Sequence, residues 1–144
     1  MDRTFTLDEA NALLPVLETL LRGAIRNRKR VEELQKEVQE LQHRVFLSGG
    51  ALLNIGDLIA HRAEMERVTK DIQDKLQEIA AMGVQVKDLD IGLLDFPCIV
   101  GGEIVLLCWK LGESSITHWH TVSDGFKGRR PIDARIPRSG RQPS

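Results

Sequence analysis

The chain of 144 residues has only two cysteines, few aromatic residues (4%) and a net charge of −1. The cysteines, Cys98 and Cys108, are not spaced as a Cys-x-x-Cys motif. If the chain turns at Gly101–Gly102, their positions also make a disulfide between them improbable. A net charge near zero argues against a protein dedicated to nucleic acids or to membrane surfaces.

Two further absences concern location and chemistry. No stretch approaches the roughly 20 apolar residues of a membrane span, and the N-terminus is not followed by an apolar run with a cleavage site. We therefore expect a cytoplasmic protein. No segment spells a known catalytic motif, so the sequence predicts a scaffold and a candidate site but leaves the reaction, if any, and the cofactor open.

The first half of the chain has the spacing of long helices. Thr6 and Glu9 form the pattern of a capping box. Pro15 predicts a short first helix, a kink, and a long helix that ends at about Leu47. Residues at spacings of three and four then indicate a coiled-coil seam, with Asn27 as its polar member, at Leu13, Leu17, Leu20, Ala24, Asn27, Val31, Leu34, Val38, Leu41 and Val45.

A second helix is predicted from Gly56–Asp57 to a C-cap at Gly83. Its apolar positions are Leu58, Met65, Val68, Ile72, Leu76 and Ile79. Folding the helices back on each other places Val31 beside Ile72, so that the two seams match. Residues 1–83 are therefore expected to form an antiparallel hairpin whose longer arm measures on the order of 50 Å.

Two helices bury little apolar surface on their own. We therefore expect the hairpin to pair with a second copy in a four-helix bundle, which makes the protein a homodimer. Asn27 either fixes the register of that bundle or faces solvent. The tip of the hairpin is unusually apolar and either docks a partner or caps the hairpin itself; its residues are Phe46, Leu47, Leu52, Leu53 and Ile55.

The first helix also carries a basic run, Arg22, Arg26, Arg28, Lys29 and Arg30. No aromatic side chains interleave these charges, and four glutamates follow. This pattern favours a solvated helix face over a nucleic-acid site.

After Gly83 the apolar pattern becomes that of extended chain. Strands are predicted at 84–86, 93–96, 104–109 and 116–120, separated by turn residues. Residues 84–132 should form a small antiparallel sheet at the base of the hairpin, and residues 133–144 a mobile tail. The predicted fold class is α+β: a long, coiled-coil-like antiparallel helical hairpin with a small antiparallel β-sheet module.

Residues that carry chemistry gather between Cys108 and Pro131. A turn at Gly101–Gly102 sets Cys108 opposite Asp95. If the second hairpin pairs Trp109 with Trp119, Cys108 also lies opposite His120. Alternation then places both tryptophans on one face of the sheet and four zinc-type ligands on the other: Asp95, Cys108, His118 and His120.

That metal site depends on register, because a slip of one residue turns the histidines to the opposite face. In the structural alternative, His118 is exposed and His120 bonds to a buried carboxylate, Glu113 or Asp124. A third interpretation is a proton-transfer or organic-ligand site in which His120 acts as acid or base.

The glycine-punctuated segment 123–131 brings Arg129 and Arg130 near the edge of the sheet. Arginine pairs well with carboxylates and phosphates. We favour internal ion pairs to Glu113 or Asp124 over a small anionic ligand. The candidate ligand-binding residues are Trp109, Glu113, Trp119, His120, Asp124, Arg129 and Arg130.

The chain resembles an uncharacterised bacterial family, domain-of-unknown-function family 2203, through nearly everything up to Ile132. The shared motifs are FTLDEANALLP (5–15), GLLDFP (92–97), LCWKLGE (107–113), and Trp119–His120 followed by DGF (124–126) and Gly128–Arg129. The resemblance implies an architecture and no activity. In the family the position of His118 is often another residue, which weakens the paired-histidine metal site and favours a unit of Glu113, Trp119, His120, Asp124 and Arg129.

The leading prediction is a homodimeric, non-enzymatic binding or adaptor module with a polar recognition site on its sheet. The first alternative is a small metal-binding protein or enzyme that uses His120 with Asp95, Cys108 and Glu113. The second is a nucleic-acid-contacting factor that works through the basic helix face.

Overall fold

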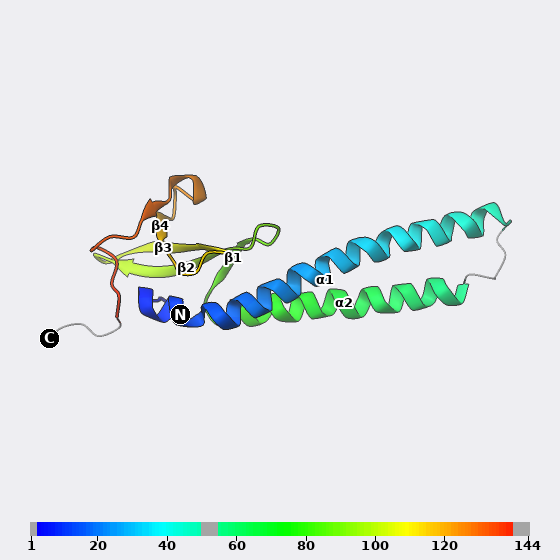
Figure 1. The fold of residues 1–144 in the computed structure, drawn as a ribbon, viewed down its shortest axis with the longest axis horizontal. Helices are drawn as coiled ribbons and strands as arrows, with labels where there is room; N and C mark the ends of the chain where they lie inside the picture. Colours follow the sequence, from blue (N-terminus) through cyan, green and yellow to red (C-terminus); the bar gives the residue numbers. More distant parts are fainter. Residues whose placement is uncertain (1–2, 50–54, 140–144) are drawn as a thin grey trace. The chain divides into compact units, whose positions relative to one another are not determined.

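A computed structural model describes residues 3–49 and 55–139. Its elements are α1 (Leu7–Leu47), α2 (Ile55–Ala81), β1 (Gln85–Asp88), β2 (Leu93–Val100), β3 (Glu103–Lys110), β4 (His118–Thr121), the short 3-10 helix η2 (Phe126–Gly128) and β5 (Arg130–Pro131) (Figure 1). The fold class is α+β, as predicted, with two long helices and one five-stranded antiparallel sheet. None of the helices in the described ranges is long and apolar enough to cross a membrane.

The chain forms two compact units. One contains residues 1–21 and 76–144, and therefore the sheet together with the first turns of α1 and the last turns of α2. The other contains residues 22–75, the antiparallel part of the two helices. Gly83, with a φ of 90°, ends α2 where the sequence predicts a C-cap.

The capping box of α1 is confirmed. The backbone N–H of Thr6 donates to Glu9 Oε1 at 2.9 Å, and the N–H of Glu9 donates to Thr6 Oγ1 at 3.3 Å. The predicted break at Pro15 is wrong, because α1 is one continuous helix. A proline here removes one helical hydrogen bond, and burial of Leu14, Leu17 and Leu21 on the same stretch offsets that loss.

Within residues 22–75 the two helices run side by side in opposite directions (Figure 1). The predicted register is wrong by about one helical turn. The side chain of Asn27 donates to Asp71 Oδ2, and Arg30 pairs with Glu64. Val31 therefore does not lie beside Ile72, as predicted, but opposite the turn of α2 that precedes it. Asn27 faces α2 rather than solvent.

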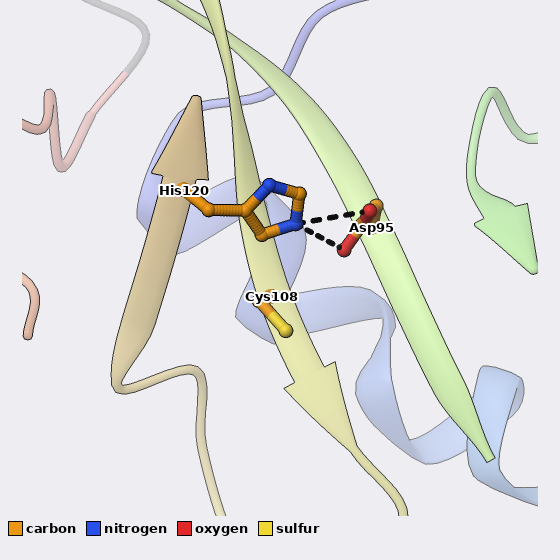
Figure 2. Close-up of side chains that lie close together, drawn as sticks. All are labelled: Asp95, Cys108 and His120. Atoms are coloured by element: carbon orange, nitrogen blue, oxygen red, sulfur yellow. Dashed lines mark hydrogen bonds and ion pairs between the residues drawn. The ribbon is translucent and has the colours of Figure 1, made fainter. Parts of the chain in front are cut away.

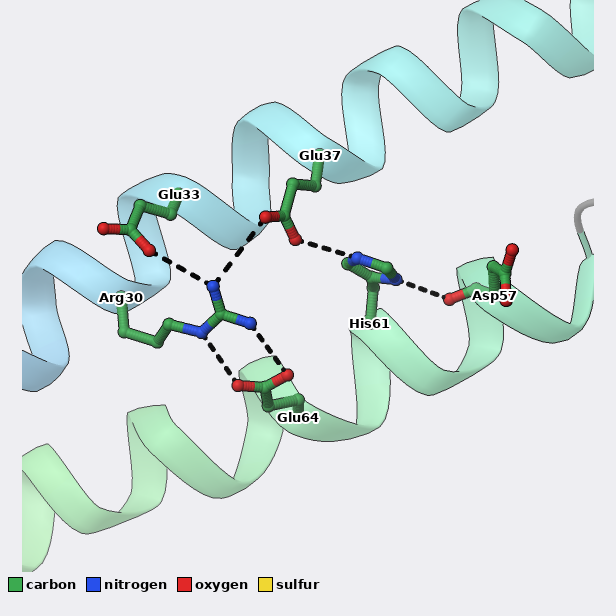
Figure 3. Close-up of polar contacts among 6 residues, drawn as sticks. All are labelled: Arg30, Glu33, Glu37, Asp57, His61 and Glu64. Carbon is green, nitrogen blue, oxygen red and sulfur yellow. Dashed lines mark hydrogen bonds and ion pairs between the residues drawn. The ribbon is translucent and has the colours of Figure 1, made fainter.

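A polar network closes one side of this hairpin (Figure 3). Arg30 donates to both carboxylate oxygens of Glu64, at 2.8 and 3.1 Å, and to Glu33 at 3.1 Å. His61 Nε2 lies 2.8 Å from Glu37. The pKa of His61 is raised, chiefly because its other ring nitrogen bonds to the carbonyl of Asp57 at 2.7 Å.

At the hairpin tip, the described residues Phe46 and Leu47 are 78% and 69% exposed. Leu52 and Leu53, also expected at the tip, lie outside the described residues. The proposed role of this tip as a docking surface stays a prediction.

The sheet has the strand order β1-β2-β3-β4-β5. The predicted register of β2 with β3 is confirmed, since Asp95 pairs with Cys108 and Cys98 with Val105. Gly101 and Gly102, both with positive φ, form the tight turn between these strands. The register assumed for β3 with β4 is wrong by two residues, because Cys108 lies opposite His118 and Leu106 opposite His120.

The two faces of the sheet differ in composition. One face carries buried apolar side chains, among them Phe96, Trp109 and Trp119, and Phe5 packs edge to face on Phe96 with ring centroids 5.6 Å apart. Trp109 on this face donates its indole N–H to the carbonyl of Glu113 at 2.9 Å. Side chains alternate along a strand, so the shift of two residues between β3 and β4 leaves each side chain on its predicted face. Asp95, Cys108, His118 and His120 therefore lie together on the other face of the sheet, as predicted.

The segment after residue 132 has specific contacts. Ile136 is 2% exposed, and the backbone N–H groups of Leu7 and Asp8 donate to the carbonyls of Pro137 and Arg138, both at 2.8 Å. These carbonyls satisfy the free amides in the first turn of α1. These contacts do not test the predicted mobility of residues 133–144, which stays a prediction.

Candidate metal site

Three adjacent strands bring a carboxylate, a thiol and an imidazole together on the polar face of the sheet. Asp95 comes from β2, Cys108 from β3 and His120 from β4 (Figure 2). One ligand atom from each lies within 4.8 Å of the other two. The three residues are 1%, 0% and 3% exposed, so the cluster is inside the protein.

Both ring nitrogens of His120 are engaged. Nε2 lies 3.1 Å from each oxygen of Asp95, and Nδ1 lies 2.8 Å from the carbonyl of Thr121. A carbonyl can only accept, so Nδ1 carries a proton. A second proton must lie between Nε2 and Asp95, since two acceptors would otherwise face each other. Burial raises the pKa of Asp95, against the opposing effect of the nearby His120 charge.

The thiol of Cys108 is neutral at ordinary pH. Burial, with a smaller effect from the charge of Asp95, raises its pKa to about 11. Arg129 acts in the opposite direction, because its positive charge and hydrogen bond favour the thiolate. Cys98 and Cys108 are both free thiols.

Arg129 and Glu113 lie beside the cluster. Arg129 Nη1 is 3.8 Å from Glu113 Oε2, and the guanidinium stacks over Phe126 at 4.5 Å. Arg129 Nη1 is buried without a hydrogen-bond partner among the described residues. Glu113 also closes the turn after β3, because its Oε1 accepts from the N–H of Lys110 at 2.7 Å.

Arg130, the other arginine of the segment 123–131, pairs with Asp124 at 3.5 Å. Together with the pair between Arg129 and Glu113, this contact agrees with the internal ion-pair interpretation. A small anionic ligand at these arginines stays a prediction.

The structure does not bring every predicted ligand into the cluster. His118 lies opposite Cys108, but its Nδ1 is 2.8 Å from the hydroxyl of Thr117 and it is not part of the group that converges. The buried carboxylate that His120 contacts is Asp95, rather than Glu113 or Asp124.

The tryptophans lie away from the cluster, on the opposite face of the sheet. Trp119 is 4% exposed, with Arg130 5.3 Å and Arg135 5.1 Å from its ring. Sequence reasoning missed Arg135 and the carbonyl of Thr121. A backbone carbonyl carries no sequence signal, and Arg135 falls in the segment expected to be mobile.

Fold and site define an α+β protein of two long helices and a five-stranded sheet that buries an Asp–Cys–His cluster. A family model matches residues 3–132, and the chain belongs to that family, the uncharacterised conserved proteins DUF2203. The resemblance identified from the sequence motifs is thereby confirmed, and the family description names no activity. Neither the curated proteins nor the solved structures gave a match.

Proposed function

We propose that this protein binds one divalent transition-metal ion of the zinc type through Asp95, Cys108 and His120. The observation that carries the proposal is the convergence of their ligand atoms within 4.8 Å. Zinc binds oxygen and nitrogen at about 2.0–2.2 Å and sulfur at about 2.3 Å, so tetrahedral ligand atoms lie roughly 3–4 Å apart. Small side-chain rotations would bring these three groups to that spacing.

The orientation of His120 supports this role. Metal-bound histidines usually donate their other ring N–H to a carbonyl or carboxylate, which fixes the tautomer and the ring. The contact of 2.8 Å between Nδ1 and the carbonyl of Thr121 has this form. It leaves Nε2 directed at Asp95 and beside Cys108 (Figure 2).

Charge balance also favours a divalent ion. Without metal the cluster consists of a neutral thiol and a carboxylate–imidazole pair that holds one shared proton, so its net charge is zero. A divalent ion would replace the thiol proton and the shared proton, and the net charge would again be zero. A buried site tolerates this exchange because it leaves no uncompensated charge in a low dielectric.

A purely structural role for the ion pair of Asp95 and His120 explains fewer features of the site than metal binding does. An apolar pair of similar volume is often as stabilising as a buried ion pair, so stability alone gives weak reason for Asp95 and His120. It gives no reason for a thiol within 4.8 Å of both. A metal site uses all three groups. In this proposal the protein is cytoplasmic, because a reducing compartment would keep Cys108 as the free thiol that ligation needs.

A titration of the untagged full-length protein with Co²⁺ tests the proposal. We expect saturation at about one ion per chain, with the visible bands of a tetrahedral site and a thiolate-to-cobalt charge-transfer band. Cys108→Ser removes the charge-transfer band, whereas Cys98→Ser, which changes the other buried thiol, keeps it. A wild-type protein that shows no such band in excess Co²⁺ does not bind metal as proposed.

A further inference from the structure

The two sides of the helical hairpin in residues 22–75 differ in character. The network of Arg30, Glu33, Glu37, His61 and Glu64 closes one side (Figure 3). At 3.6 residues per turn, Val31 of α1 and Leu58, Met65 and Thr69 of α2 lie toward the other side of the hairpin. All four are only half-buried. This second side therefore keeps apolar surface that the hairpin alone does not cover.

An open groove lies on the same side of α2. Its volume is about 560 Å³, and it is lined by Arg62, Met65, Glu66, Thr69, Lys70 and Gln73. These residues follow the i, i+3, i+4 spacing of a single helix face. The groove thus forms a strip along one face of the helix.

The charges along this strip alternate in sign every four residues. Arg62, Glu66, Lys70 and Asp74 are positive, negative, positive and negative in turn, and within one chain the exposed Lys70 and Asp74 already pair at 3.5 Å. Residues four apart form a ridge on a helix surface. If a second α2 is laid antiparallel about a two-fold axis at Val68, each Arg62 meets the other copy's Asp74, and each Glu66 meets the other copy's Lys70.

We propose that this side of α2 is the contact surface between two copies of the chain, paired antiparallel about a two-fold axis near Val68. A two-fold contact requires a surface complementary to itself, and the alternating ridge meets that requirement without help from any other protein. The half-buried Met65, which lines the groove together with Glu66 and Lys70, would supply an apolar contact beside these charges. The arrangement is a four-helix bundle of two hairpins.

The available area fits a reversible dimer. The part of α2 in this unit, Ile55 to Lys75, is roughly 30 Å long at 1.5 Å per residue. Two helices side by side are about 20 Å wide. The contact therefore covers about 600 Å² per copy, or about 1,200 Å² in total, which is the lower limit for specific protein interfaces.

Charge reversal in the full-length chain tests the pairing by sedimentation equilibrium at low ionic strength. We expect wild type to associate reversibly to twice the mass of one chain. Glu66→Lys sets two lysines opposite each other and Lys70→Glu sets two glutamates opposite each other, so each weakens association by about tenfold or more. The double variant restores the opposite charges and therefore the dimer. High salt reduces all these differences.

Glu40→Lys is the matched control, because it makes the same charge change on α1 away from the strip and leaves association unchanged. Circular dichroism checks that all variants keep their helices. A wild type with the mass of one chain at about 100 µM overturns the proposal, since a surface that pairs two copies has to hold them together at that concentration. A double variant no tighter than the single ones also overturns it. Either result leaves metal binding untouched, because Asp95, Cys108 and His120 belong to the other unit.

Discussion

Replacing His120 with alanine abolishes metal binding, whereas replacing His118 with alanine leaves it nearly unchanged. The two histidines lie on the same strand and the same face of the sheet, but only Nε2 of His120 converges with Asp95 and Cys108. Changing a residue that only hydrogen-bonds to a metal ligand lowers metal affinity by roughly 10–100-fold. We expect His120→Ala to lower the affinity for Zn²⁺ by well above that amount. Competition with a chromophoric chelator for Zn²⁺ measures both affinities.

This comparison needs a check on folding. Removing one partner of a buried ion pair costs about 3–5 kcal/mol of unfolding free energy, and His120 and Asp95 form such a pair. Cys108→Ser therefore serves as a second variant, since it keeps the pair and nearly the volume of the thiol. Equal losses of affinity in His118→Ala and His120→Ala would contradict the assignment of ligands.

Metal affinity should also fall about 100-fold for each unit that the pH is lowered near neutrality. The reason is the release of about two protons on binding, one from the thiol of Cys108 and one shared by His120 and Asp95. Each released proton contributes about tenfold per pH unit, because protons then compete with the metal for the same groups. Lower pH thus weakens binding.

Calorimetry of Zn²⁺ binding in buffers with different protonation enthalpies counts these protons directly. The matched variant is Cys108→Ser, whose hydroxyl is not expected to ionise on binding, so that about one proton remains. A wild-type count near zero would mean that neither the thiol nor the carboxylate–imidazole pair gives up its proton to the metal, which is incompatible with the proposed site.

The cluster could be predicted from the sequence in part, because different features fix the two strand pairings. The turn at Gly101–Gly102 allows one close alignment, so Asp95 was placed opposite Cys108 correctly. The connection between β3 and β4 spans residues 111–117, and a loop of that length permits several alignments. The register assumed there was wrong by two residues, yet the even shift kept His120 on the face of Cys108.

For the helices, too, only part of the structure could be predicted from the sequence. Their caps follow from local residue types, and Thr6, Glu9 and Gly83 act as predicted. The register between the helices does not, because an apolar seam repeats every turn or two and matches in several alignments. Polar contacts decide between these alignments, and the pair of Arg30 with Glu64 is visible only once the helices are placed together.

Pro15 shows a local preference overruled by packing. The proline predicts a break in the helix, but α1 continues through it. Leu14, Leu17 and Leu21 are all buried in the unit that contains the sheet, and they would lose that position if the helix ended at residue 14. The sequence shows both the proline and the apolar spacing of the leucines, but it does not show which of the two effects on the helix is larger in free energy.

Anomalous diffraction at the zinc absorption edge, from crystals of the untagged protein grown with zinc, tests the central claim most directly. We predict one strong peak per chain between β2, β3 and β4, about 2.0–2.4 Å from an oxygen of Asp95, Sγ of Cys108 and Nε2 of His120. Zinc found only at surface groups, with His120 Nε2 still bonded to Asp95, would contradict the metal site.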